Sequence, residues 1–142
     1  MTALKIVAFW LLKTEPNCWS WEQQLKDRIT HWDGVRNHQA QKHMRSMLVG
    51  DQAFFYHTGT ERRIVGTVKI IRAAYPDHTD PAGKMAMVDM EALKTFANPV
   101  SLADIKKDSR LEHLALVKQG RLSVVPIDDQ AWDLITSWGR PI

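Results

Sequence analysis

Short runs of apolar, β-branched and aromatic residues along the chain predict strands. The first run, from Ile6 to Leu12, ends shortly before Pro16 and has the length of a buried strand. Similar runs predict strands at 52–58, 63–74, 85–92 and 122–126, with a turn around Gly59 between the first two of these. Tyr75-Pro76-Asp77 is expected to break the strand at 63–74, and residues 77–84 to form an exposed loop.

Between these runs, apolar residues at helical spacing and capping residues predict short helices. Ser20 with Gln23 forms a capping box at the start of the first helix. A second helix is expected from about Asn37, with a glycine cap at its end, and a third follows Ser101 and ends near Lys107. The last helix starts at Asp128. The apolar faces of the second and last helices are predicted to comprise Ala40, Met44, Met47, Leu48, Trp132 and Ile135, and the glycine cap is Gly50.

The order of these elements favours an α+β fold. Most of the predicted strands follow one another without a crossover helix, which is typical of a curled, mostly antiparallel sheet flanked by short helices. No glycine-rich phosphate loop follows the first strand, so a dinucleotide-binding sheet is disfavoured. The 142 residues contain no repeat or Gly/Ser linker, and residues 1–142 are expected to form a single domain.

Composition adds a weak preference for an anionic partner. The formal net charge is +3 and the chain contains six tryptophans, a residue type common at binding surfaces. One cysteine, Cys18, rules out an intrachain disulfide and suits a reducing compartment. The longest apolar run is far shorter than the roughly 20 residues of a membrane helix. We therefore expect a cytoplasmic protein, or a nuclear one in a eukaryote, without a membrane partner.

Metal binding and catalysis receive little support from residue spacing. None of the six histidines pairs with another at i, i+4, and Cys18 has no second thiol, so no metal site is expected. Cys18, beside a tryptophan, is expected in the core. Glu15 with Lys13 or His57 would make a general acid–base pair only if the fold brought them together, which keeps a hydrolase or nuclease as a rival reading.

Base recognition is favoured by the surroundings of Trp32. Its neighbours Asp33, Arg36 and Asn37 are polar, whereas Trp10 and Trp132 lie in apolar patterns and are expected in the core. A packing role at the start of a helix is the alternative for Trp32. An exposed indole stacks on a base, and nearby amide and hydroxyl groups select the base by its edge.

Several motifs, in one order along nearly the whole chain, resemble the EVE domain family. They are Phe9-Trp10-Leu11-Leu12-Lys13-Thr14-Glu15-Pro16, Trp32-Asp33-Gly34-Val35-Arg36-Asn37, Gly50-Asp51 with Phe54-Phe55-Tyr56-His57, Tyr75-Pro76-Asp77 and Arg121-Leu122-Ser123-Val124. The resemblance implies a PUA-like curled β-barrel, related to the YTH domains that hold methylated adenine in RNA. It also implies binding without catalysis, no cofactor, and a pocket for a modified base, with modified cytosine in DNA the usual suggestion. An RNA-binding PUA-like module is the alternative partner class.

Carried over to this chain, the resemblance gives a set of expected pocket residues. They are Lys13, Thr14, Glu15, Pro16, Trp32, Val35, Arg36, Asn37, His57, Thr58, Arg121 and Ser123. Within this set we expect Trp32 to stack on the base, with edge contacts from Thr14, Asn37, Ser123 and the Glu15 carboxylate. Arg36, Arg121 and Lys13 are expected to contact phosphates, which position the strand without reading its sequence.

Overall fold

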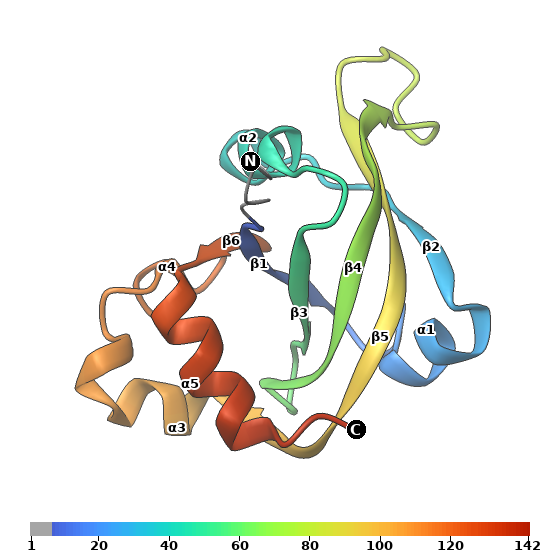
Figure 1. Ribbon diagram of the computed structural model, residues 1–142. Helices are drawn as coiled ribbons and strands as arrows, with labels where there is room; N and C mark the ends of the chain where they lie inside the picture. Colours follow the sequence, from blue (N-terminus) through green and yellow to red (C-terminus); the bar gives the residue numbers. More distant parts are fainter. Residues whose placement is uncertain (1–6) are drawn as a thin grey trace, which may run out of the picture.

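A computed structural model describes residues 7–142, which fold into one curled six-stranded sheet with short helices around it (Figure 1). The strands run in the order β2-β5-β4-β3-β1-β6, and β1 and β3 are parallel whereas all other neighbours are antiparallel. The strands are β1 (Phe9–Thr14), β2 (Ile29–Trp32), β3 (Gln52–His57), β4 (Arg63–Pro76), β5 (Ala86–Ser101) and β6 (Val124–Ile127). The helices are α1 (Trp21–Asp27), α2 (His38–Ser46), α3 (Leu102–Lys107), a 3₁₀ turn (Ser109–Leu111), α4 (Ala115–Lys118) and α5 (Asp129–Gly139).

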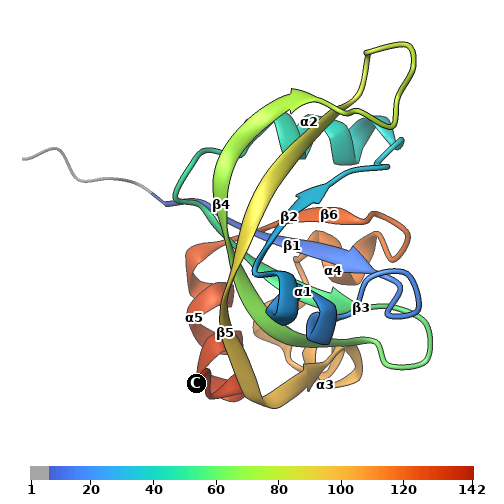
Figure 2. The ribbon, with the colours of Figure 1, turned by 90° about the vertical axis from the view of Figure 1, so that its right-hand side faces the viewer.

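The expected curled, mostly antiparallel α+β architecture is confirmed, but the barrel is not closed. β2 and β6 are the two edge strands, and each has only four residues. Long β4 and β5 bend across the molecule and carry several register shifts, which allow the sheet to curl (Figure 2). Within residues 7–142, β2 pairs only with β5, and β6 only with β1.

Stacked aromatic rings fill the core between the sheet and α5. The Trp132 ring lies 3.9 Å from the Phe54 centroid and 4.3 Å from that of Phe9, nearly parallel to both. Trp10 is buried and donates its indole N–H to the Asp51 carboxylate at 3.0 Å. The assignment of Trp10 and Trp132 to the core is therefore confirmed, and neither ring lies at a surface where a base could stack.

Most helix starts follow the predicted capping residues. Ser20 and Gln23 form the complete capping box, and Asn37, Ser101 and Asp128 each cap a helix through the side chain. The end of α2 was predicted wrongly: the helix ends at Ser46, Leu48 is exposed, and Gly50 lies in the turn that follows. No helix among residues 7–142 is both long and apolar enough to cross a membrane.

Strand boundaries differ from the prediction where tertiary pairing decides them. β4 continues through Pro76, whose missing N–H costs little at the end of a hairpin, and β5 extends beyond Ala92 to Ser101 because it pairs along β4. β2 and α4, each four residues long, were not predicted. The first strand starts at Phe9, and Ile6 lies outside the described residues.

Candidate functional site

A hollow of about 390 Å³ opens between the end of β1, the turn before α1, and β2. This volume falls in the range of small-ligand sites and exceeds what one nucleobase occupies. Its walls are two indoles, two threonines and three smaller or ionisable residues. The lining residues are Thr14, Cys18, Trp19, Thr30, His31, Trp32 and Asp33.

The two indoles of the hollow differ in burial. Trp32 is only 8% exposed and packs edge-on against Phe55, with the ring centroids 5.7 Å apart. Trp19 is partly buried and packs against the rim of the core. Trp32 therefore combines the predicted pocket position with the packing role that was its alternative, and Trp19 is the more accessible aromatic wall.

The open edge of β2 borders this hollow. The Ala92 N–H donates to the Arg28 carbonyl at 2.8 Å, and the register continues through Ile29 opposite Glu91. Bonded and non-bonded pairs alternate in an antiparallel ladder, so the main-chain N–H and C=O of His31 point away from β5. Because β2 is an edge strand, no second strand within residues 7–142 pairs with these groups.

At the end of β1, only Thr14 of the four expected residues lines the hollow. Its hydroxyl donates to the Trp19 carbonyl at 3.0 Å. Glu15 is exposed and accepts a hydrogen bond from the Thr58 hydroxyl at 3.1 Å, while Pro16 begins the turn that leads toward α1. The Lys13 ammonium donates to the Gly120 carbonyl at 3.0 Å, and burial lowers its pKa.

A second, shallower hollow of about 310 Å³ lies between the start of α2 and the segment that connects α4 to β6. Asn37 and Arg121 both line it, together with Gln39 and residues 119–122. The Asn37 side chain caps α2 by accepting from the Ala40 N–H. Ser123 pairs through its carbonyl with the Lys13 N–H at 2.9 Å, which connects this hollow to the end of β1. The structure thus separates Asn37, Arg121 and Ser123 from the hollow of Trp32.

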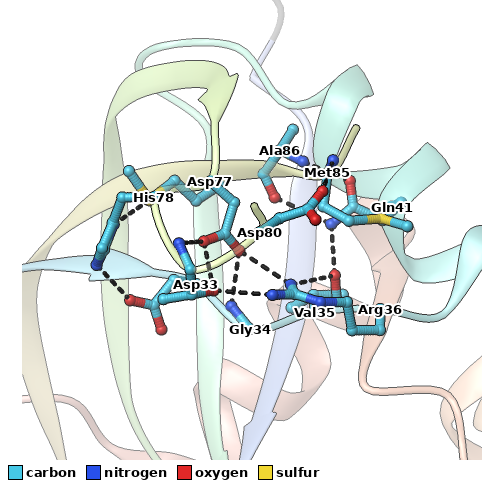
Figure 3. Close-up of polar contacts among 12 residues, drawn as sticks. Asp33, Gly34, Val35, Arg36, Gln41, Asp77, His78, Asp80, Met85 and Ala86 are labelled. Carbon is cyan, nitrogen blue, oxygen red and sulfur yellow. Dashed lines mark hydrogen bonds and ion pairs between the residues drawn. The ribbon is translucent and has the colours of Figure 1, made fainter. Parts of the chain in front are cut away.

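A polar brace holds the segment that leads from Trp32 to α2 (Figure 3). The buried Asp77 carboxylate accepts from the Gly34 N–H at 2.8 Å and from the Arg36 guanidinium at 3.2 Å. Burial alone would raise the pKa of Asp77, but hydrogen bonds from Thr79, Gly34 and Arg36 outweigh it and lower the pKa to about 2. Arg36, a predicted phosphate contact, is thereby engaged within the protein.

The remaining expected residues are also engaged in structural contacts. Val35 is buried, and its carbonyl accepts from the side chain of Gln41, which also bonds both main-chain groups of Ala86. His57 is buried, accepts from the Trp21 N–H at 3.0 Å, and contacts Glu61 through its other ring nitrogen at 2.9 Å. Both nitrogens of His57 are used, so the Glu15–His57 acid–base pair is not assembled.

Several lining residues of the hollow were not predicted. Trp19 was not among the expected pocket residues, and the unpredicted strand β2 supplies Thr30 and His31. Cys18 was expected in the core but is exposed, because it lies in the turn after Pro16. Between residues 7 and 142 no cluster of three or more His, Cys, Asp or Glu has the arrangement of a metal site.

His31, one of the lining residues of the hollow, also takes part through its ring in an ionisable cluster with Asp89 and Tyr75. Its Nδ1 lies 2.8 Å from the Asp89 carboxylate, which also accepts from the Tyr75 hydroxyl. Burial, with the hydrogen bond and charge of Asp89, raises the pKa of Tyr75 to about 12, so its hydroxyl stays protonated. The cluster fixes β2 against β4 and β5.

Comparison with known proteins shows which family the chain belongs to. A sequence profile of the EVE domain matches residues 8–138, which is nearly all of the chain. The chain belongs to the EVE family. Human thymocyte nuclear protein 1 is 32% identical over 167 aligned residues, which cover 90% of this chain and 72% of the human protein.

Two solved structures of EVE-type chains are similar over nearly their full length. Rpa0253 from Rhodopseudomonas palustris, solved by NMR, is 47% identical with a TM-score of 0.89, over 94% of both chains. The crystal structure of human THYN1 in complex with DNA containing 5-methylcytosine is 32% identical with a TM-score of 0.82, over 92% of this chain and 96% of that one. The likeness confirms the fold expected for the family.

Proposed function

We propose that this EVE domain binds nucleic acid by holding one modified base, 5-methylcytosine in DNA being the leading candidate, and that it does so without catalysis. One observation carries the proposal: a hollow large enough for a single base, with Trp19 and Trp32 in its walls, in a chain whose human relative was crystallised with 5-methylcytosine DNA. The indoles supply stacking, and Thr14, Thr30 and the free main chain of His31 supply hydrogen bonds.

The energetics of base capture require this combination. A base that leaves its stack loses a few kcal/mol, and one aromatic contact returns about 1–3 kcal/mol. Edge contacts from the threonine hydroxyls and the open edge of β2 add the remainder and discriminate between bases. Asn37 and Ser123, which were expected to contact the base edge, lie toward the second hollow. We therefore assign them contacts with the nucleotides that flank the captured base.

Affinity for a panel of oligonucleotides tests this function. Strands that carry cytosine, 5-methylcytosine or thymine at one position, as DNA and as RNA, are titrated at fixed salt. We expect the wild type to bind the 5-methylcytosine DNA best and Trp19→Ala to weaken that binding about 10–100-fold, from the loss of one stacked ring. Trp19 is the better site for this test than Trp32, because removing the buried Trp32 ring also opens a core cavity.

A matched control is Trp138→Ala, because Trp138 is also half-buried but lies on α5, outside the hollow. This variant is expected to keep the wild-type affinity. Equal affinity for every strand, or equal loss in both variants, would contradict the proposal; a preference for the RNA strands would assign the same pocket to RNA.

Phosphate contact is expected at Arg121. Of the three predicted phosphate contacts, Lys13 and Arg36 already bond Gly120 and Asp77, whereas Arg121 is exposed and has no ion pair with the described residues. Each phosphate contact contributes about one unit to the slope of log affinity against log salt concentration. Arg121→Ala should lower that slope by about one at unchanged base preference. Arg110→Ala, which removes an exposed arginine already paired with Asp108, should leave the slope unchanged.

The enzymatic reading loses its main support because His57 has no free ring nitrogen. The same titrations test it: release of a cleaved or modified strand would contradict binding without catalysis. A cytoplasmic location, or a nuclear one in a eukaryote, and a single domain over residues 1–142 stay predictions from the sequence.

A further inference from the structure

A fully buried glutamine links the two walls of the hollow. Gln24 lies in α1, is 0% exposed, and lines no part of the hollow itself. Its amide oxygen accepts from the Trp19 indole N–H at 2.9 Å, and its amide nitrogen donates to the Arg28 carbonyl at 2.9 Å. An indole N–H only donates and a carbonyl only accepts, so these two partners fix the orientation of the amide.

The Arg28 end of this link leads directly into β2. Arg28 ends α1 with a φ of 65°, a positive value that residues with a side chain rarely adopt. Its carbonyl accepts from both the Gln24 amide and the Ala92 N–H, and its guanidinium donates to the Ala92 carbonyl. Such a conformation persists where the surroundings hold it. The next residues, Ile29–Trp32, are β2.

The Trp19 end of the link is held from both sides. The Trp19 carbonyl accepts from the Thr14 hydroxyl at 3.0 Å, and its N–H donates to the Glu15 carbonyl at 3.0 Å. The main chain of Trp19 is thereby attached to β1, and Gln24 attaches its indole to the start of β2. Without Gln24, apolar packing would still contact the Trp19 indole, but no polar contact among the described residues would fix the rotation of the ring.

We infer that Gln24 is a positioning residue that sets the orientation of Trp19 relative to β2, and thereby preorganises the hollow for one flat ring. The inference rests on the proposed base-binding function and adds to it the residue that fixes the geometry of the stacking wall. A preorganised wall loses less conformational freedom on binding, so the amide contributes to affinity without touching the base.

A double-mutant cycle in binding affinity separates positioning from general stability. Gln24→Met removes the polar link at nearly constant volume, and Trp19→Phe removes its indole N–H. With the 5-methylcytosine oligonucleotide as probe, each variant is expected to weaken binding about tenfold, and the double variant also about tenfold instead of the roughly hundredfold of two independent losses.

Gln41→Met is the matched control. Gln41 is likewise 0% exposed and bonds only main-chain groups, those of Val35 and Ala86, away from Trp19. Both glutamine variants should lower the thermal midpoint, but the effects of Gln41→Met and Trp19→Phe on affinity should multiply. If Gln24→Met does not fold, Gln24→Asn replaces it, since an amide shorter by one methylene cannot reach both partners.

The outcomes distinguish this inference from the function on which it rests. Multiplying effects for the Gln24 and Trp19 variants, as for the Gln41 control, would overturn the positioning role while leaving base binding intact. Failure of the wild-type domain to prefer the 5-methylcytosine strand over the cytosine strand would instead overturn the proposed function.

Discussion

Replacing Gly66 by alanine is expected to lower the free energy of unfolding by about 3 kcal/mol, because the new methyl group meets a ring that has no room to move. An ideal Cβ at Gly66 would lie 2.3 Å from the nearest carbon of the Trp21 indole, with two further ring carbons within 2.7 Å. Trp21 is buried, packs against Phe55, and donates its indole N–H to the Thr95 hydroxyl at 3.0 Å.

The ring of Trp21 belongs to α1, so relief of this clash displaces the helix that carries Gln24. Urea unfolding followed by circular dichroism measures the effect. Gly120→Ala is the matched control, since a Cβ there would meet nothing within 4 Å, and it should change the stability by less than about 0.5 kcal/mol. A loss below about 1 kcal/mol in Gly66→Ala would show that the indole shifts freely.

Asp77→Asn is expected to cost about 2–3 kcal/mol at pH 7, because the substitution removes the anion that Arg36 and two main-chain N–H groups bind. The new asparagine amide would also place an N–H₂ group, which cannot accept a hydrogen bond, against the N–H donors that surround this position. The cost reflects the loss of the brace that fixes residues 33–37 between β2 and α2 (Figure 3). Asp80→Asn is the matched control in the same loop, since Asp80 is half-buried and its side chain bonds only neighbouring main-chain N–H groups, and it should destabilise less.

The same carboxylate gives the wild type a measurable acid dependence. The native pKa of Asp77 is about 2, below the ordinary value of 3.8 in the unfolded chain. Its ionised form therefore stabilises the fold fully well above pH 3.8, by about 2 kcal/mol, and this stabilisation is lost as the pH falls from about 5 toward 2. The stability gap between wild type and Asp77→Asn should shrink by that amount over this window. Parallel stability curves from pH 6 to pH 2 would contradict the assignment.

Sequence patterns were sufficient where local chemistry decides the structure. Helix starts follow from Ser20, Asn37 and Asp128, because a capping side chain acts within three residues of its own position. The aromatic core at Trp10 and Trp132 follows from the apolar patterns around them. The curled sheet follows from strands that succeed one another without crossover helices.

The site was harder to predict because pairing between distant segments forms it. β2 has only one buried residue, Trp32, and its strand character comes from pairing with β5. Without β2 there was no reason to bring Trp19 to Trp32. Asn37 and Arg36 were expected in the pocket because they follow Trp32 in the same motif. In the structure, the Asn37 side chain caps α2 and the Arg36 side chain pairs with Asp77.

All residues that line the hollow fall between Thr14 and Asp33, while the sheet that supports it is drawn from the whole chain. One continuous segment, from the end of β1 through β2, therefore supplies every lining residue of the hollow, and β3, β4 and β5 supply none of them. Under the proposed function, exchange of residues 14–33 between EVE domains should transfer the preferred base, because this segment brings every lining residue of the hollow with it.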